Sequence, residues 1–473
     1  MRPAVLGWLR DDEGSMAFLV AFLLIPLFGF LGLAIDAARG YLLESRLSQA
    51  LDAAALAGGR VMFDDTRDAD IRKFFLANFP EGYLGARVSG PAIVADGEGE
   101  RITVSASATI NTTFMRLFDQ NEMTVSARTV VQRSVRGMEL VLVMDNTGSM
   151  LSGGKIDAMK AGASELVNIL YNGRDEVPNF WVSLVPYTAT VNIGKTHTGW
   201  LAVPAIGPGD AVPAGNFVDY RVSPQGWKGC VEARHMRGND MTDATPSVEK
   251  FQPFFWASSS DNVYPPLKED IRLNTTSNEG TGPNLGCGPA ITPMVADRPT
   301  ILAAIAEMLP WHRGGTLTNV GLAWGWRLLS PDWRGLWSAA TPQLPLDYNT
   351  AYIDKAVVIL TDGENLLYDY KNHPEGSDYT AYGRLGWKRL GTSKRDLAKK
   401  EADRRMSVVC QAMKQRGVVV FTITFQVNGS ETRDLFRKCA TKPEYYFNSP
   451  TNEQLRTAFR TIGTTLSNLR LAQ

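Results

Sequence analysis

The sequence predicts a membrane-anchored α/β protein. We expect an N-terminal transmembrane helix with a stalk, a small α+β unit, and a doubly wound α/β domain with a large insertion. Three observations lead to this prediction. Residues 16–35 form an uncharged apolar run. From residue 137 onward, short apolar runs alternate with helical patterns, as in a mostly parallel sheet. Residues 195–298 interrupt that alternation with a stretch rich in Gly, Pro, Trp and Asn.

Composition limits the classes of function. The chain has 473 residues, and 49 Lys plus Arg balance 49 Asp plus Glu, so the formal net charge is zero with His neutral. This balance gives no support to nucleic-acid binding. An apolar fraction of 44% argues against disorder. Four cysteines are too few for a small disulfide-dense scaffold.

The apolar run, MAFLVAFLLIPLFGFLGLAI, predicts a retained single-pass anchor. As a helix, residues 16–35 span about 30 Å, the hydrocarbon thickness of a bilayer. A cleaved signal peptide has a shorter apolar region and a small-x-small site, whereas here a helical pattern continues past Asp36. The flanking basic residues are balanced: Arg2 and Arg10 before the run, Arg39 and Arg46 after it. The positive-inside rule therefore does not set the orientation.

The helical pattern after the anchor predicts a stalk that completes a first part, residues 1–60. Apolar residues of the stalk fall near one face: Leu43, Leu47, Ala50, Ala54 and Leu56. The stalk resembles the N-terminal helix of pilin-like proteins, and the alternative is a juxtamembrane helix packed on its own domain. Residues 61–136 are expected to be the small α+β unit, with a helix over 68–79 and period-two alternation over 101–132.

The third part, residues 137–473, is the predicted α/β domain, with an inserted subdomain at about 195–298. Apolar runs typical of buried strands lie at 139–144, 180–185, 355–360 and 417–425, with a short strand at 445–448. Helical patterns lie at 155–170, 299–309, 319–329, 397–416 and 451–469. Thr451 is the expected N-cap of the last helix.

The cysteines fit two disulfides in an oxidising compartment, because the chain has no C-x-x-C spacing. That would place everything after residue 36 outside the cytoplasm. The pairs Cys230–Cys287 and Cys410–Cys439 are favoured, although four cysteines allow three pairings and sequence does not fix them. A zinc site at Cys230, His235 and Cys287 is disfavoured because no fourth ligand is evident.

Three loops carry oxygen ligands at the expected strand ends. Asp145, Thr147 and Ser149 follow the strand at 139–144, and Asp362 follows the strand at 355–360. Between them, the glycine-opened loop 314–318 offers the hydroxyl of Thr316. Ligands collect at the carboxyl ends of strands in an open parallel sheet. Hard oxygen ligands suit Mg²⁺ or Ca²⁺ and suit zinc poorly.

These loops, in this order, resemble the metal-ion-dependent adhesion site of von Willebrand factor type A domains. The resemblance implies that Thr147, Ser149 and Thr316 bind the metal directly, with Thr318 as the competing threonine. It implies that the two aspartates act directly or through water. The implied cofactor is Mg²⁺, or Ca²⁺ or Mn²⁺, with an open position for a partner's acidic side chain. The alternative is a relic of the fold without a working site.

No enzyme motif is found in the sequence. There is no G-x-S-x-G and no H-E-x-x-H, and residues 148–155 lack the Ser or Thr that follows the lysine of a phosphate loop. We therefore expect metal-bridged binding rather than catalysis. Five tryptophans lie close together in sequence, and we interpret them as core rather than as a carbohydrate site: Trp311, Trp324, Trp326, Trp333 and Trp337.

Both ends of the chain carry further motifs. At the front they are the anchor, Asp36, Gln49 and L-D-A-A-A-L-A-G at 51–58, and at the back Val409-Cys410, Phe421-Thr422-Ile423 and Lys438-Cys439-Ala440. With these motifs the chain resembles TadG-like proteins of the bacterial Flp (tight-adherence) pilus-assembly system. The resemblance implies a Gram-negative inner-membrane protein with its bulk in the periplasm and with pilin-like or pilus-assembly partners. The alternatives are a structural component whose metal only stabilises the fold, and a surface adhesin with a lectin-like insertion.

Overall fold

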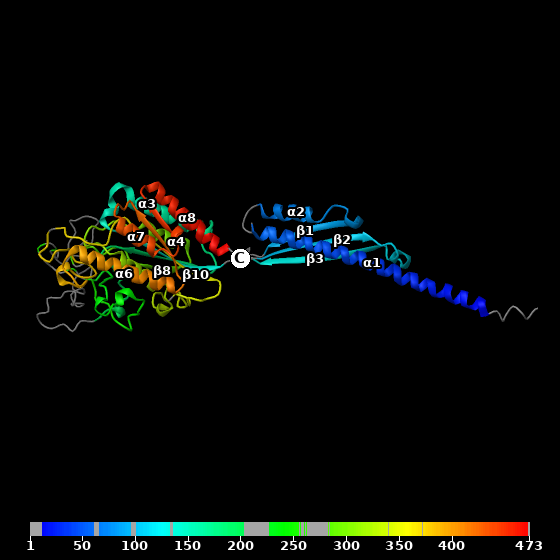
Figure 1. The fold of residues 1–473 in the computed structure, drawn as a ribbon, viewed down its shortest axis with the longest axis horizontal. Helices are drawn as coiled ribbons and strands as arrows, with labels where there is room; N and C mark the ends of the chain where they lie inside the picture. The colour runs from blue at the N-terminus through cyan, green and yellow to red at the C-terminus, as the bar shows by residue number, and fades with distance from the viewer. Residues whose placement is uncertain are drawn as a thin grey trace, which may run out of the picture. The chain divides into compact units, whose positions relative to one another are not determined.

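The computed structural model describes residues 12–60, 66–95, 101–132, 136–202, 227–254, 284–338, 340–370 and 372–471, and residues 256, 260, 262 and 282. Contacts divide the chain into two compact units, Met1–Val135 and Arg136–Gln473 (Figure 1). Arg2 and Arg10 lie outside the described residues. So do all of 203–226 and most of 255–283, and predictions about those parts of the insertion stay predictions.

The N-terminal unit is built on one long helix, α1 (Asp12–Arg60), which runs through the predicted anchor and stalk without a break. The continuation past Asp36 is therefore confirmed. Helix α2 (Arg67–Asn78) follows, and then an antiparallel sheet in the order β1 (Arg87–Ala95), β2 (Arg101–Asn111) and β3 (Glu122–Gln132). Strand β1 was not predicted, since most of its side chains are exposed and it lacks an apolar alternation.

The core of this unit lies between α1 and the sheet. Alternate residues of β2 are buried, as predicted: Ile102, Val104, Ala106, Ala108 and Ile110. On α1 the side chains of Leu43, Leu47, Ala50 and Ala54 are buried against them. Leu56 was predicted on the same face and is instead 65% exposed. It comes two residues after Ala54, about 200° further around the helix, so it lies on another face. The stalk therefore packs on its own domain.

The C-terminal unit contains the predicted doubly wound sheet. Five strands are parallel, in the order β13 (Tyr446–Ser449), β12 (Val419–Phe425), β10 (Ile353–Thr361), β4 (Gly137–Asp145) and β5 (Phe180–Tyr187). Short antiparallel strands extend the sheet beyond β5: β6 (Val191–Asn192), β7 (Cys230–Val231) and β8 (Thr292–Val295). A separate pair is formed by β9 (Gly315–Thr316) and β11 (Leu366–Leu367).

Helices cover both faces of this sheet, which explains the continuous apolar strands. In β4, Leu140 and Leu142 face one core and Val141 and Val143 face the other. The first core receives α3 (Lys155–Tyr171), α4 (Arg298–Ala306) and α8 (Asn452–Leu471). The second receives α5 (Thr318–Leu329), α6 (Arg395–Gln415) and α7 (Ser430–Cys439). Only α7 among these helices was not predicted.

Several smaller predictions are confirmed. The disulfides Cys230–Cys287 and Cys410–Cys439 are formed. Thr451 caps α8, because its hydroxyl accepts a hydrogen bond from the Gln454 backbone N–H at 3.2 Å. The five tryptophans at 311–337 are all buried in the core.

Candidate metal centre

The sheet brings the two predicted aspartates to the same edge. Strands β4 and β10 are parallel neighbours, with Val143 level with Ile359. Asp145 ends β4, and Asp362 comes directly after β10. Strand register, rather than loop flexibility, therefore sets how close the two carboxylates come.

Hydrogen bonds join four of the five predicted site residues into one polar cluster. Thr147 donates to Asp145 Oδ1 from its backbone N–H at 2.9 Å and from its hydroxyl at 2.6 Å. The hydroxyl oxygens of Thr147 and Ser149 lie 3.0 Å apart. Ser149 in turn donates to Asp362 Oδ1 at 2.6 Å. The residues of the first loop and the residue after β10 thus share one site, which we name the Asp145–Asp362 cluster.

Lys155 also belongs to this cluster, and it was not predicted from the sequence. Its ammonium donates to Asp362 Oδ2 at 2.9 Å, and the carboxylate is completely buried. Lys155 is the first residue of α3, so the turn after Ser149 returns it to the site. From the sequence, we considered Lys155 only as a residue of a phosphate loop. Its partner lies 207 positions away, so no local pattern indicates the ion pair.

The electrostatic setting of Asp145 favours a cation. Complete burial, followed by repulsion from Asp362, raises the pKa of Asp145 to about 7, although hydrogen bonds from Thr147 and Thr361 act in the opposite direction. Thr361 donates to Asp145 Oδ2 at 2.8 Å. Burial and the nearby Asp145 carboxylate raise the pKa of Tyr187 well above its ordinary value, so this hydroxyl stays protonated.

The fifth predicted ligand, Thr316, lies apart from these contacts. It pairs with Leu366 in the short β9–β11 ladder. The hydroxyl of the competing threonine, Thr318, lies 3.3 Å from the Tyr187 hydroxyl. The Tyr187 hydroxyl in turn lies 3.3 Å from Asp145 Oδ2, so Tyr187 links Thr318 to the cluster. Which threonine serves as a ligand stays a prediction.

The donor set fits a hard divalent cation. Among the residues that the structure describes, no group of three or more His, Cys, Asp or Glu side chains could hold a metal. The site therefore depends on two carboxylates together with hydroxyls, the ligand chemistry of Mg²⁺ and Ca²⁺. The two carboxylates, when ionised, outweigh the single ammonium of Lys155. A further positive charge would relieve the repulsion that raises the pKa of Asp145.

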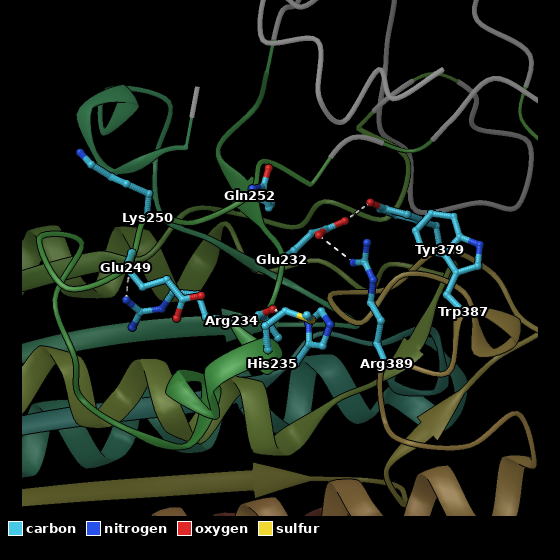
Figure 2. Close-up of a pocket in the computed structure, with 11 residues that line it drawn as sticks. Glu232, Arg234, His235, Glu249, Lys250, Gln252, Tyr379, Trp387 and Arg389 are labelled. Atoms are coloured by element: carbon cyan, nitrogen blue, oxygen red, sulfur yellow. Dashed lines mark hydrogen bonds and ion pairs between the residues drawn. The ribbon is translucent and has the colours of Figure 1, made fainter. Parts of the chain in front are cut away.

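A separate pocket of about 510 Å³ lies where the insertion meets the chain at 379–389. Figure 2 shows Glu232 between the Tyr379 hydroxyl and Arg389, with Trp387 at one side. Tyr379 and Arg389 both bond the Glu232 carboxylate, the latter at 2.7 Å. Trp387 is 41% exposed. The pocket therefore combines an accessible aromatic ring with polar groups that already bind one another.

Comparison with known proteins identifies the N-terminal segment. Residues 14–61 match the Tad family, described as Flp pilus-assembly, TadE/G-like. This match covers the predicted anchor and stalk. No curated protein matches the chain. The TadE/G-like segment coincides with α1, which is long and apolar enough to cross a membrane, and it is the single such helix in the described part of the chain.

Solved structures with similarity to the chain include pilus proteins. The pilus adhesin SpaC from Lactobacillus rhamnosus GG is 11% identical over 81% of this chain, with a TM-score of 0.34, and the chain spans about a third (34%) of its length. The vWF domain of the type V pili tip protein Mfa5 from Porphyromonas gingivalis is 10% identical (72% of this chain, 97% of that chain; TM-score 0.37). Proximal thread matrix protein 1 from the mussel byssus, with a zinc-occupied MIDAS motif, is 11% identical. That match covers 71% of this chain and 47% of the mussel protein, with a TM-score of 0.31.

Proposed function

We propose that the protein is a membrane-anchored, metal-dependent protein-binding module that supports Flp pilus assembly or surface attachment. The observation that carries this proposal is the Asp145–Asp362 cluster, in which two carboxylates and two hydroxyls from separate loops form one continuous site. The proposed parts are the anchor and stalk at 1–60, the small unit at 61–136 and a type A domain at 137–473, with its insertion at about 195–298. Catalysis has no part in this function.

The residues that would hold the ion are the predicted ones. Asp145, Thr147, Ser149 and Asp362 supply the oxygens, with Thr316 or Thr318 as a further hydroxyl. A bound Mg²⁺, Ca²⁺ or Mn²⁺ would supply a positive charge that a partner's carboxylate can approach. Lys155 holds Asp362 and neutralises part of its charge. The partner is an acidic surface of another pilus-assembly or pilin-like component.

The proposed location is the inner membrane, with the bulk of the chain in the periplasm. The TadE/G-like helix supports the membrane anchor. Two formed disulfides support an oxidising compartment for the C-terminal unit, since such bonds are rare in the cytosol.

Pilus counts in cells test this function. A strain that produces the Ser149→Ala protein should lose most surface pili or most attachment, while immunoblots show normal levels of the protein. The matched control is Ser152→Ala in the same loop, whose hydroxyl donates to the Ser149 backbone carbonyl at 3.0 Å. Normal piliation with Ser149→Ala would contradict the proposal. Loss of pili together with loss of the protein would favour the alternative of a metal that only stabilises the fold.

The adhesin alternative has its own observation, the pocket beside Trp387. Aromatic rings with adjacent polar groups are suited to bind sugars. A glycan array probed with the full chain and with Trp387→Ala separates the two functions. Glycan binding that Trp387→Ala abolishes would favour the adhesin, and the absence of glycan binding would leave the metal-dependent module as the function.

A further inference from the structure

The loop between β2 and β3 packs one side on α1 and leaves much of its apolar surface exposed. Three large side chains of this loop are exposed: Phe114 by 37%, Leu117 by 77% and Phe118 by 61%. We name residues 112–121 the hairpin loop. Exposed apolar groups of this size that lie together mark a binding surface.

The hairpin loop lies beside the end of the predicted membrane span. A methyl group added to Gly32 would come within 2.6 Å of the Phe114 side chain, so the loop packs directly on the helix backbone there. A methyl group on Gly29 would lie 3.8 Å from the Phe118 ring. Both glycines belong to the apolar run 16–35. The loop therefore reaches back alongside the part of α1 that is proposed to lie in the bilayer.

Asp36 holds the hairpin loop in this position. Its carboxylate is 1% exposed and accepts hydrogen bonds from three consecutive backbone N–H groups, those of Thr113, Phe114 and Met115, at 2.9, 2.7 and 2.8 Å. Arg39 forms an ion pair with Asp36 at 3.5 Å and donates to the Thr113 hydroxyl at 2.6 Å. A backbone N–H group without a hydrogen-bond partner is costly near lipid. Because Asp36 accepts hydrogen bonds from these three N–H groups, the loop can enter an apolar environment without that cost.

We propose that the hairpin loop inserts Phe114, Leu117 and Phe118 into the interface of the same bilayer that α1 crosses. This inference rests on the proposed membrane anchor. Gly29 lies seven residues before Asp36, which is about 10 Å along a helix. Amphipathic interfacial segments bury their apolar groups to a comparable depth, about 5–10 Å. The exposed Arg116 is placed among the apolar side chains, where its guanidinium can meet lipid phosphates.

The second contact fixes the orientation of the N-terminal unit on the membrane. A single helix can rotate and tilt freely about its span, whereas a helix and a loop that both enter the interface define one face. The stalk would then present the exposed side of its sheet in a fixed direction. The chemistry selects lipid rather than a protein partner, because the apolar surface continues the apolar surface of the span itself.

Site-specific fluorescence on the full chain tests the inference. All four cysteines are in disulfides, so an introduced cysteine is the single free thiol. An environment-sensitive dye is attached to Leu117→Cys, and the protein is placed in vesicles of phosphatidylethanolamine and phosphatidylglycerol that contain a lipid spin-labelled near the headgroup. The matched control is Leu56→Cys, a similarly exposed leucine (65%) on α1, about 30 Å beyond Asp36 along the helix. Phe30→Cys reports on the anchor.

The expected result is lipid quenching at Leu117→Cys that is several-fold stronger than at Leu56→Cys, together with strong quenching at Phe30→Cys. Equal, weak quenching at Leu117→Cys and Leu56→Cys, with Phe30→Cys quenched, would overturn the loop inference and leave the anchor intact. Weak quenching at Phe30→Cys would overturn the anchor and, with it, the loop insertion. A Leu117→Cys dye that is shielded but not quenched by lipid would show a protein partner instead, and would also overturn the inference.

Discussion

Asp36 in the N-terminal unit and Asp145 in the C-terminal unit are both buried carboxylates at the end of an apolar run, yet their partners differ. Asp36 accepts hydrogen bonds from three backbone N–H groups. Asp145 accepts from one backbone N–H and from the hydroxyls of Thr147, Thr361 and Tyr187. A hydroxyl can rotate and offer a lone pair, whereas a backbone N–H can only donate. The donors around a buried carboxylate, rather than its burial, thus separate a structural aspartate from a candidate metal ligand.

The largest effect is expected when the structural carboxylate is removed. Asp36→Ala leaves three backbone N–H groups without their acceptor, and each such donor costs roughly 1–3 kcal/mol when buried, so the free energy of opening the hairpin loop should fall by about 3–9 kcal/mol. Hydrogen exchange measured by mass spectrometry on residues 112–121 checks this result. Asp52→Ala is the control, because Asp52 is exposed on the same helix and accepts a hydrogen bond from the Thr129 hydroxyl rather than from backbone N–H groups of the loop. Equal exchange rates in Asp36→Ala and Asp52→Ala would contradict the structural role assigned to Asp36.

A smaller effect is expected at Lys155. Lys155→Met leaves the buried Asp362 carboxylate without its ammonium partner, so the metal-free protein should lose roughly 3–5 kcal/mol of unfolding free energy. Saturating Mg²⁺ should restore most of this loss, because the ion replaces the missing positive charge. Chemical denaturation in EDTA and in Mg²⁺ measures both values. The control is Lys160→Met on the same helix, where the ammonium donates to the Met308 carbonyl at 3.3 Å. A loss that Mg²⁺ does not restore would argue that Lys155 has a purely structural role.

The smallest effect, with the opposite sign, is expected at Asp145. Its pKa is raised from 3.8 to about 7 by burial and by Asp362. Between these pH values the folded protein keeps the proton that the unfolded chain has released, so this group makes stability fall as pH rises through that window. Asp145→Asn lacks this dependence, and at pH 8 in EDTA it should be as stable as the wild type or more stable by about 1 kcal/mol. Thermal unfolding across pH checks this, and a strongly destabilised variant would contradict it.

The sequence predicted those parts of the fold that have a local physical signal. The continuous apolar runs at 139–144 and 355–360 predicted the central parallel strands, because a sheet covered on both faces needs apolar residues in every position. The loop residues that follow these strands were predicted for the same reason, since the strand ends fix where the loops begin. Alternation in β2 likewise predicted its buried face.

Features that depend on distant partners could not be predicted in this way. The ion pair of Lys155 with Asp362 joins residues 207 positions apart and leaves no periodic pattern. Asp36 was noted as the end of the apolar run and as a residue of the N-terminal motif, but its role in holding the hairpin loop was not predicted, because its three donors lie 77 to 79 residues later in the chain. Strand β1 lacks a buried face and therefore lacks an alternation. Tertiary structure alone shows these roles.

The most direct test of the metal centre is a calorimetric Mg²⁺ titration of the full chain in detergent, beside Asp145→Asn, Ser149→Ala and Ser152→Ala. Circular dichroism shows first that all four proteins are folded. We expect saturable binding of one ion to the wild type and to Ser152→Ala, and loss of that binding in Asp145→Asn and Ser149→Ala. Folded wild-type protein that binds no Mg²⁺, Ca²⁺ or Mn²⁺, or binding that all three variants retain, would contradict a metal centre at the Asp145–Asp362 cluster.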